Sequence, residues 1–173
     1  MVSPCVFLIG MMGAGKTTVG SQLARHLGRR FVDLDHEIEN QTGVKIPIIF
    51  EIEGEAGFRD RESHTLAEFA AQEGLIVATG GGVVLRSENR EILKKAGIVV
   101  YLSADPQLLY ARTRRSTNRP LLQGIDPLKK IYELHIQRDP LYREVADISV
   151  VSHGGSVMQL VKQIDKELKK CAR

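Results

Sequence analysis

Eight residues near the start of the chain have the composition of a phosphate-binding loop. Residues 10–17 read GMMGAGKT, which fits the pattern G-x-x-x-x-G-K-[ST], and they follow an apolar run at 5–9. Glycines let backbone N–H groups converge on phosphate oxygens, and the N-terminus of the helix that follows favours anions. In this pattern Lys16 reaches the β- and γ-phosphates, and the Thr17 hydroxyl ligates Mg²⁺. The loop predicts a binding site for a nucleoside triphosphate.

Two aspartates form the next candidate group. Asp33 and Asp35 stand two residues apart at the end of a predicted strand over 31–35. Alternate residues of a strand project to the same face, so we expect both carboxylates on one side near its carboxyl end. One carboxylate could bind Mg²⁺, and the other could accept the proton of an attacking hydroxyl, as a phosphoryl transfer requires. The alternative is that both acids cap a helix that starts near His36.

An arginine with a candidate role follows in the segment 54–62, which reads GEAGFRDRE. This segment starts a predicted helix, and Arg59 lies in its first turns. A cation is disfavoured near a helix N-terminus unless an anion is held there. A substrate carboxylate would provide that anion, because a guanidinium binds a carboxylate through two parallel hydrogen bonds. The alternative is a surface ion pair of Arg59 with Glu55 or Glu62.

A glycine run and a basic loop complete the candidates. Residues 80–82 are all glycine and close a predicted strand, so a ligand could approach their backbone N–H groups. The alternative there is a flexible strand-to-helix turn. Segment 112–125 is polar and basic and contains Pro120 and Gly124, which suits a lid that excludes water and brings an arginine to the phosphates. Its alternative is an ordinary solvated loop.

The elements that must position these residues alternate along the chain. Short β-branched apolar runs predict strands at 5–9, 31–35, 75–79, 98–102 and 148–151. Amphipathic stretches predict helices at 16–27, 58–73, 87–96, 106–115, 126–139 and 155–170. This alternation indicates an α/β fold, a doubly wound parallel sheet with helices on both faces. Ligands of such sheets bind beyond the carboxyl ends of the strands, where the aspartates and glycines stand.

Local signals support the predicted helix ends. Ser87 and Asp105 are expected as N-caps, and Pro106 and Pro127 suit the first turns of their helices. With 173 residues, no internal repeat and no linker-like segment, we expect a single domain over 1–173.

The bulk composition disfavours several classes of function. The net charge is +3, there is no Trp, and no basic run or stacking platform suggests nucleic-acid binding. No apolar stretch approaches the roughly 18 residues of a membrane span. Only Cys5 and Cys171 are present, which favours a reducing compartment without disulfides. We therefore expect a cytoplasmic protein with small anionic substrates, no nucleic-acid partner and no membrane partner.

Taken together, these motifs resemble those of the shikimate kinase family. The resemblance covers residues 10–17, 33–35, 54–62, 80–82, 119–122, 138 and 141–147. It implies transfer of the γ-phosphate of ATP to the 3-hydroxyl of shikimate, with Mg²⁺, in aromatic amino-acid biosynthesis. It also implies a P-loop kinase fold with a five-stranded sheet of order 2-3-1-4-5. A substrate-binding helical region at about 36–62 and a lid at about 112–125 would complete it.

The resemblance also implies roles for nucleotide- and metal-binding residues. The expected ATP-binding residues are Gly13, Ala14, Gly15, Lys16, Thr17, Thr18, Arg112 and Arg119. Among them Arg112 would flank the adenine and Arg119 would meet the phosphates. Thr17 would ligate Mg²⁺, with Asp33 near the metal. Residues 152–155 match the family's variable adenine loop and receive no individual role.

For the acceptor, the resemblance implies a clamp and a base. The expected shikimate-binding residues are Asp35, Phe50, Phe58, Arg59, Gly81, Gly82 and Arg138. Asp35 would bind ring hydroxyls and act as base, so that the catalytic residues would be Lys16, Asp35 and Arg119. The chain departs from the family pattern at Ile48, where many members carry a polar or acidic residue.

Other classes of nucleotide-binding protein also have a phosphate loop of this kind. A nucleoside monophosphate kinase or a gluconate kinase would need a different acceptor site, whereas two arginines and an aspartate favour a hydroxylated carboxylate. A GTPase-type switch would need an Asn-Lys-x-Asp guanine reader, which the chain lacks. A nucleic-acid-binding ATPase would need a basic stripe. We expect a monomer.

Overall fold

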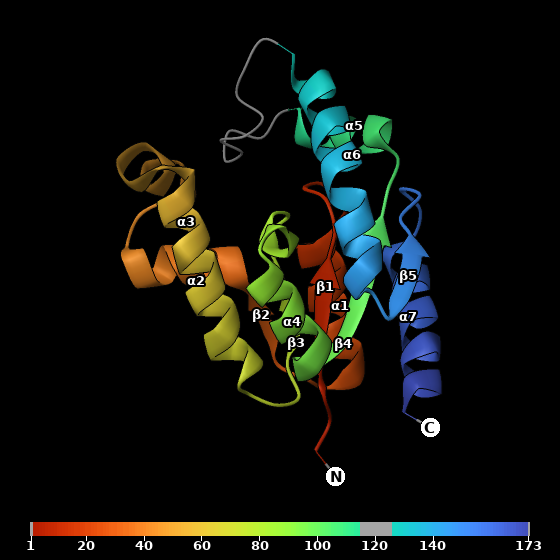
Figure 1. Ribbon diagram of the computed structural model, residues 1–173. Coiled ribbons are helices and arrows are strands. Elements are labelled where there is room, and N and C mark those ends of the chain that lie inside the picture. Colours follow the sequence, from red (N-terminus) through yellow and green to blue (C-terminus); the bar gives the residue numbers. More distant parts are fainter. Residues whose placement is uncertain (1, 115–125, 173) are drawn as a thin grey trace.

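A five-stranded parallel sheet forms the centre of the molecule (Figure 1), in a computed structural model that describes residues 2–114 and 126–172. The strands are β1 (Cys5–Ile9), β2 (Phe31–Asp33), β3 (Ile76–Ala78), β4 (Gly97–Ser103) and β5 (Ile148–Val151). Their order is β2-β3-β1-β4-β5 and every neighbouring pair is parallel. The predicted fold class and strand order are confirmed.

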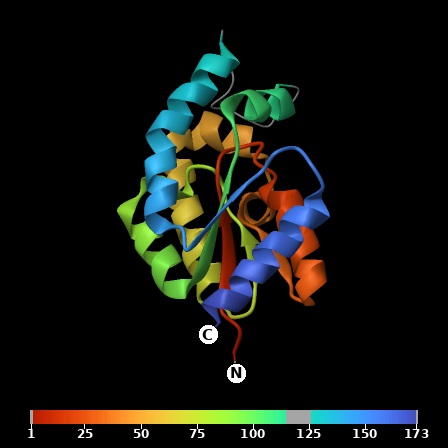
Figure 2. The same ribbon diagram turned by 90° about the vertical axis from the view of Figure 1, so that its right-hand side faces the viewer.

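Helices cover both faces of this sheet. They are α1 (Lys16–Leu27), α2 (Leu34–Thr42), α3 (Ile46–Ala70), α4 (Ser87–Ala96), α5 (Pro106–Thr113), α6 (Pro127–Val145) and α7 (Val157–Cys171), with a short 3₁₀ turn η1 (Val83–Leu85). Figure 2 shows α1 and α7 on one face and α4 and α6 on the other. Because both faces are covered, the central strands between them must be apolar on both sides.

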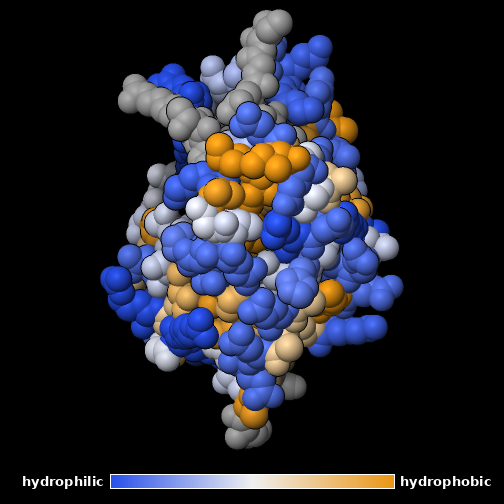
Figure 3. Space-filling model, turned by 90° about the vertical axis from the view of Figure 1, so that its left-hand side faces the viewer, coloured by the Kyte–Doolittle hydropathy of each residue, from blue (hydrophilic) through white to orange (hydrophobic). Residues whose placement is uncertain are grey.

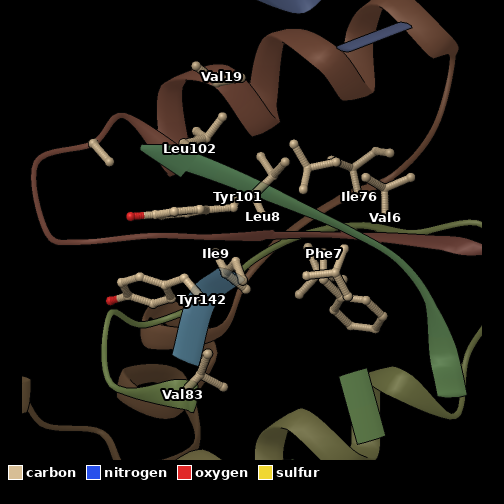
Figure 4. Packing of buried hydrophobic residues seen from close by; sticks show 14 of the residues in the cluster. Val6, Phe7, Leu8, Ile9, Val19, Ile76, Val83, Tyr101, Leu102 and Tyr142 are labelled. Carbon is tan, nitrogen blue, oxygen red and sulfur yellow. The ribbon is translucent and has the colours of Figure 1, made fainter. Parts of the chain in front are cut away.

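The central strand β1 shows how this requirement is met. All five of its residues are buried. Leu8 packs on the side of α1 with Val19, whereas Ile9 packs on the opposite side with Tyr142 and Val83 (Figure 4). Burial of both faces explains why β1 reads as a continuous apolar run with no polar alternation.

The second strand is shorter than predicted. β2 ends at Asp33, and α2 begins at Leu34, so Asp35 lies in the first turn of a helix and not on a strand. The Asp33 side chain caps this helix by accepting a hydrogen bond from the His36 N–H over 3.2 Å. The prediction that strand geometry aligns the two carboxylates was therefore wrong, and helix capping by Asp33 is real.

The helix predicted at 58–73 is the second part of a longer element. α3 starts at Ile46 with Pro47 in its first turn, and it is kinked at Gly54, whose backbone angles are φ 72° and ψ 179°. These angles are accessible almost only to glycine. The kink separates two helical parts with different directions, which obscures a single helical period in the sequence.

The remaining helix ends were predicted with mixed success. Asp105 caps α5 through the Gln107 N–H, and Pro106 and Pro127 occupy first turns as expected. Ser87 is not an N-cap, because it is the first helical residue of α4 and Arg86 precedes it without a side-chain cap. α6 was expected to end at 139, yet it continues through Pro140 to Val145.

The surface carries few large exposed apolar side chains. Val44, Ile48 and Ile52 are exposed near and in the first part of α3, and an apolar area is visible on the face where α2 and α3 lie (Figure 3). None of the helices in the described ranges is long and apolar enough to cross a lipid bilayer. Cys5 is buried and Cys171 is exposed, both as free thiols.

Candidate active site

Two cavities open at the carboxyl edge of the sheet and share one wall. The larger, of about 490 Å³, lies over the phosphate loop, and the smaller, of about 310 Å³, lies between α2, α3 and the glycine run. The residues common to both are Met12, Thr17, Asp33, Asp35 and Gly81. A group bound in one cavity therefore meets a group bound in the other beside two carboxylates and a hydroxyl.

The phosphate loop lines the larger cavity in the predicted way. Gly13 and Gly15 have φ values of 82° and 99°, and Gly15 is the N-cap of α1. The ammonium group of Lys16 donates hydrogen bonds to the carbonyl oxygens of Gly10 and Met11, at 2.6 and 3.0 Å. Ala14, Thr17 and Thr18 also line this cavity. The start of α1 thus points its N–H groups and a cation at the same space, which suits a polyphosphate.

Thr17 and Asp33 meet at the junction of the two cavities. The Thr17 hydroxyl donates a 2.6 Å hydrogen bond to Asp33 Oδ2. A hydroxyl and a carboxylate beside a phosphate site are oxygen ligands of the kind that Mg²⁺ prefers, because this ion keeps several waters and needs few protein ligands. Within the described ranges no cluster of three or more metal-ligating His, Cys, Asp or Glu residues exists. The two oxygen donors of Thr17 and Asp33 fit an ion that takes its other ligands from water and phosphate oxygens.

Arg112 connects the phosphate loop to the segment at 152–155. One guanidinium nitrogen donates to the Gly13 carbonyl at 3.0 Å and lies 3.2 Å from the Ser152 hydroxyl oxygen. Residues 152–155, His153 included, line the larger cavity beside Arg112. Arg112 therefore joins the glycine loop to the 152–155 segment at this end of the cavity.

The smaller cavity contains a buried ion pair. Arg59 donates to Glu62 at 2.9 Å and to Glu55 at 3.2 Å. The side chains of Arg59 and Glu62 are 9% and 1% exposed, whereas Glu55 is 52% exposed. The alternative prediction of an ion pair of Arg59 with Glu55 or Glu62 is therefore confirmed for both partners. Its location at the surface was wrong for Glu62, because the Arg59–Glu62 pair is buried in the cavity wall.

A second guanidinium lies in the same wall. Arg138 of α6 is 1% exposed and also lines the smaller cavity. Burial raises the pKa of Glu62, and the positive charges of Arg59 and Arg138 oppose that rise. Two arginines thus face one internal carboxylate, and this leaves positive charge for a carboxylate on a ligand.

The glycine run at 80–82 gives each of these side chains room. A Cβ atom at Gly82 would lie 2.3 Å from a guanidinium nitrogen of Arg59, and one at Gly81 would lie 3.2 Å from Arg138. A Cβ atom at Gly80 would lie 2.6 Å from Glu62 and 2.9 Å from Asp35. The glycines therefore do more than expose backbone N–H groups. They allow the charged side chains to approach the end of β3.

The two predicted aromatic residues lie together against the smaller cavity. The ring centroids of Phe50 and Phe58 are 4.9 Å apart, on opposite sides of the kink in α3. They supply an apolar surface next to the arginines. Ile48 is exposed and is not among the residues that line this cavity, so the departure from the family pattern lies outside the pocket wall.

The structure brings most of the predicted residues together and adds others. Arg119 and most of the segment 112–125 lie outside the described residues. Sequence reasoning gave no site role to several residues that line the smaller cavity: Met12, His36, Glu39, Ile46 and Glu62. Only Glu62 had a usable signal, since it follows Arg59 by three residues and therefore shares its helix face.

The comparisons with known proteins agree with this geometry. The family model described as shikimate kinase matches residues 12–169. The chain is 57% identical to shikimate kinase of Aromatoleum aromaticum over 163 residues, 94% of this chain and 93% of the relative. It is 49% identical, with a TM-score of 0.96, to the solved structure of shikimate kinase from Acinetobacter baumannii in complex with shikimate, covering 97% and 94% of the two chains.

A gluconokinase from Sinorhizobium meliloti shares the fold at a TM-score of 0.62, with 15% identity over 99% of this chain and 94% of that one. This likeness concerns the architecture alone. The family model and the identity to curated relatives, in contrast, extend over nearly the whole length. The chain therefore belongs to the shikimate kinase family.

Proposed function

We propose that this protein transfers the γ-phosphoryl group of ATP to the 3-hydroxyl of shikimate, with Mg²⁺, and that the two joined cavities hold the two substrates. Membership of the family makes the protein a small-molecule kinase that uses ATP. The observation that supports the arrangement most directly is the common wall at Thr17, Asp33 and Asp35. Phosphoryl transfer depends mainly on positioning and charge stabilisation, and a shared wall brings donor and acceptor together.

In this proposal the larger cavity holds ATP. The backbone N–H groups at 13–18 and Lys16 bind the phosphates, and Arg112 with the 152–155 segment flanks the adenine. Thr17 and Asp33 hold Mg²⁺, which supplies positive charge to the phosphate oxygens when it is bound. Lys16 leaves its contacts with the loop carbonyls to reach the phosphates. Arg119, by resemblance to the family, adds a further cation.

The smaller cavity holds the acceptor. Arg59 and Arg138 bind the shikimate carboxylate, the Gly81 and Gly82 backbone contributes hydrogen bonds, and Phe50 and Phe58 line the ring. Asp35 accepts the proton of the 3-hydroxyl while the oxygen bonds to the γ-phosphorus and the bond to the ADP oxygen breaks. The proposal includes a single kinase domain over 1–173 that acts as a monomer.

An acceptor panel tests the proposal. Release of ADP from ATP is measured with shikimate, gluconate, a nucleoside monophosphate or DNA as the added compound. We expect only shikimate to stimulate release, and we expect a folded Lys16→Met variant to show no stimulation. Equal stimulation by gluconate or by the nucleotide would contradict the acceptor assignment, and full activity of Lys16→Met would contradict the phosphate site.

A further inference from the structure

Tyr142 is a buried phenol that the proposed reaction leaves without a role. It lies on α6, its side chain is completely buried, and its hydroxyl donates a short hydrogen bond to the carbonyl oxygen of Gly81. Gly81 belongs to the wall that both cavities share. Tyr142 is not among the residues that line either cavity, so its hydroxyl holds the Gly81 carbonyl from outside them.

The second arginine of the clamp lies one helical turn from the same phenol. Arg138 precedes Tyr142 by four residues on α6, and its positive charge opposes the rise in the pKa of the Tyr142 hydroxyl that burial causes. A nitrogen of that guanidinium would lie 3.2 Å from a Cβ atom placed on Gly81. Tyr142, Arg138 and Gly81 thus lie close together at the wall of the smaller cavity, with Tyr142 bound directly to Gly81.

The hydroxyl can donate throughout the neutral pH range. Burial raises the pKa of Tyr142 to about 12, and the charge of Arg138 opposes part of that rise. The phenol is therefore protonated at every pH at which the protein would work. Its hydrogen bond to Gly81 is a constant feature of the site and not a switch.

The ring of Tyr142 is itself held in place. Its centroid lies 4.9 Å from that of Tyr101 on β4, and the Tyr101 hydroxyl donates a 2.6 Å hydrogen bond to Asp139. Figure 4 shows the two rings close together with their hydroxyl oxygens pointing to the same side. The two phenols differ in one respect that an experiment can use: only that of Tyr142 reaches the glycine run.

We propose that Tyr142 is a positioning residue for the acceptor's carboxylate, which fixes the Gly81 peptide and the Arg138 guanidinium at the spacing that binds an acid. This inference rests on the proposed function, because it assigns the clamp to the acceptor. Without the hydroxyl, the Gly81 peptide loses this donor and Arg138 loses a neighbour. Both must then be ordered at the moment of binding, which weakens binding of the acceptor.

The test compares Tyr142→Phe with Tyr101→Phe. Each variant removes one buried hydroxyl from the same stacked pair and keeps the ring, so general loosening of α6 against β4 affects both. We expect Tyr142→Phe to raise the KM for shikimate about three- to tenfold, the range of one net hydrogen bond, with the KM for ATP unchanged. Tyr101→Phe is expected to leave both KM values unchanged.

Several outcomes would overturn the inference: an unchanged shikimate KM in Tyr142→Phe, an equal rise in both variants, or a parallel rise for ATP. Amide hydrogen exchange of residues 80–82 gives a second readout that needs no turnover, and faster exchange is expected in Tyr142→Phe alone. If shikimate proves not to be the acceptor, this exchange comparison still decides whether the phenol holds the peptide.

Discussion

At the scale of single residues, Asp35 has the position that the proposed base requires. It lies at the junction of the two cavities, in the first turn of α2. We expect Asp35→Asn to lower kcat by about 10² to 10⁴, the usual range for loss of a general base, because an amide cannot take the hydroxyl proton. Steady-state kinetics with shikimate measure this, and Asp60→Asn, at an exposed carboxylate paired with Arg86, serves as control. Near-normal turnover of Asp35→Asn would remove Asp35 from this role.

Arg59 allows a second test at this scale. Its guanidinium binds Glu62 inside the wall, so in the proposed complex its planar fork would bind an internal and an external carboxylate together. Arg59→Lys keeps the charge but not the fork. We expect the KM for shikimate to rise about ten- to hundredfold, the range for loss of a hydrogen bond to a charged group. The matched control is Arg90→Lys on α4, where Arg90 binds the carbonyls at 84–85 and Glu144. Unchanged kinetics in Arg59→Lys would show that no bidentate clamp exists there.

At the scale of elements, the kink in α3 shapes the smaller cavity, which we propose to hold the acceptor. The chain direction changes at Gly54, and the two parts of α3 then face each other through two contacts between residues eight apart. Phe50 lies against Phe58, and Arg61 binds Glu53 through two hydrogen bonds of 2.9 and 2.7 Å. In a straight helix residues eight apart are about 12 Å from each other, so neither contact would form.

The kink can be tested by adding a side chain at Gly54. No atom lies within 4 Å of a Cβ placed there, so Gly54→Ala adds backbone strain without a steric clash. We expect it to cost about 1–3 kcal/mol, to lower the melting temperature and to raise the KM for shikimate but not for ATP.

Gly28→Ala is the matched control. Gly28 also has a positive φ, 65°, and equally open surroundings, but it ends α1 far from the acceptor cavity. It should lower the melting temperature without changing either KM. If Gly54→Ala behaves like Gly28→Ala in the kinetics, the kink has no part in acceptor binding.

At the scale of the whole molecule, the first and last helices are joined on one face of the sheet. Asp165 of α7 accepts hydrogen bonds from Lys169 on its own helix, at 3.0 Å, and from His26 of α1, at 3.1 Å. These contacts, Lys169 first, lower the pKa of Asp165 below its ordinary value. These contacts therefore stabilise the folded protein fully at a pH above the ordinary pKa of an aspartate. The stabilisation is lost as the pH falls through the lowered pKa that Asp165 has in the folded state.

We expect Asp165→Asn to destabilise the protein by at most about 1 kcal/mol at neutral pH, because the pair lies at the surface. The melting temperature should fall by no more than about 4 °C, and the difference from the parent protein should vanish once the pH falls below the lowered pKa. Thermal unfolding at several pH values measures this. Glu167→Gln is the control, since Glu167 pairs with Lys170 on its own helix. An equal effect of both variants would show that the contact with α1 contributes nothing.

The sequence alone determined the phosphate site, the sheet and the candidate acceptor residues. The loop at 10–17 lies within one strand-loop-helix unit, and buried parallel strands are apolar on both faces. The phosphate loop and the strands can therefore be predicted from residues that are neighbours in the sequence. Arg59, Arg138 and the glycines were found through their residue types and the family resemblance.

Only the tertiary structure decided how these residues combine. The sequence of α3 shows no continuous helical period across the kink at Gly54. Asp35 belongs to a helix because Asp33, the last residue of the strand, is the N-cap of α2. The burial of the Arg59–Glu62 pair in the cavity wall, the space left by Gly81 for Arg138 and the support from Tyr142 depend on elements far apart in the chain. Such contacts depend on how the elements pack in three dimensions, so local sequence patterns do not predict them.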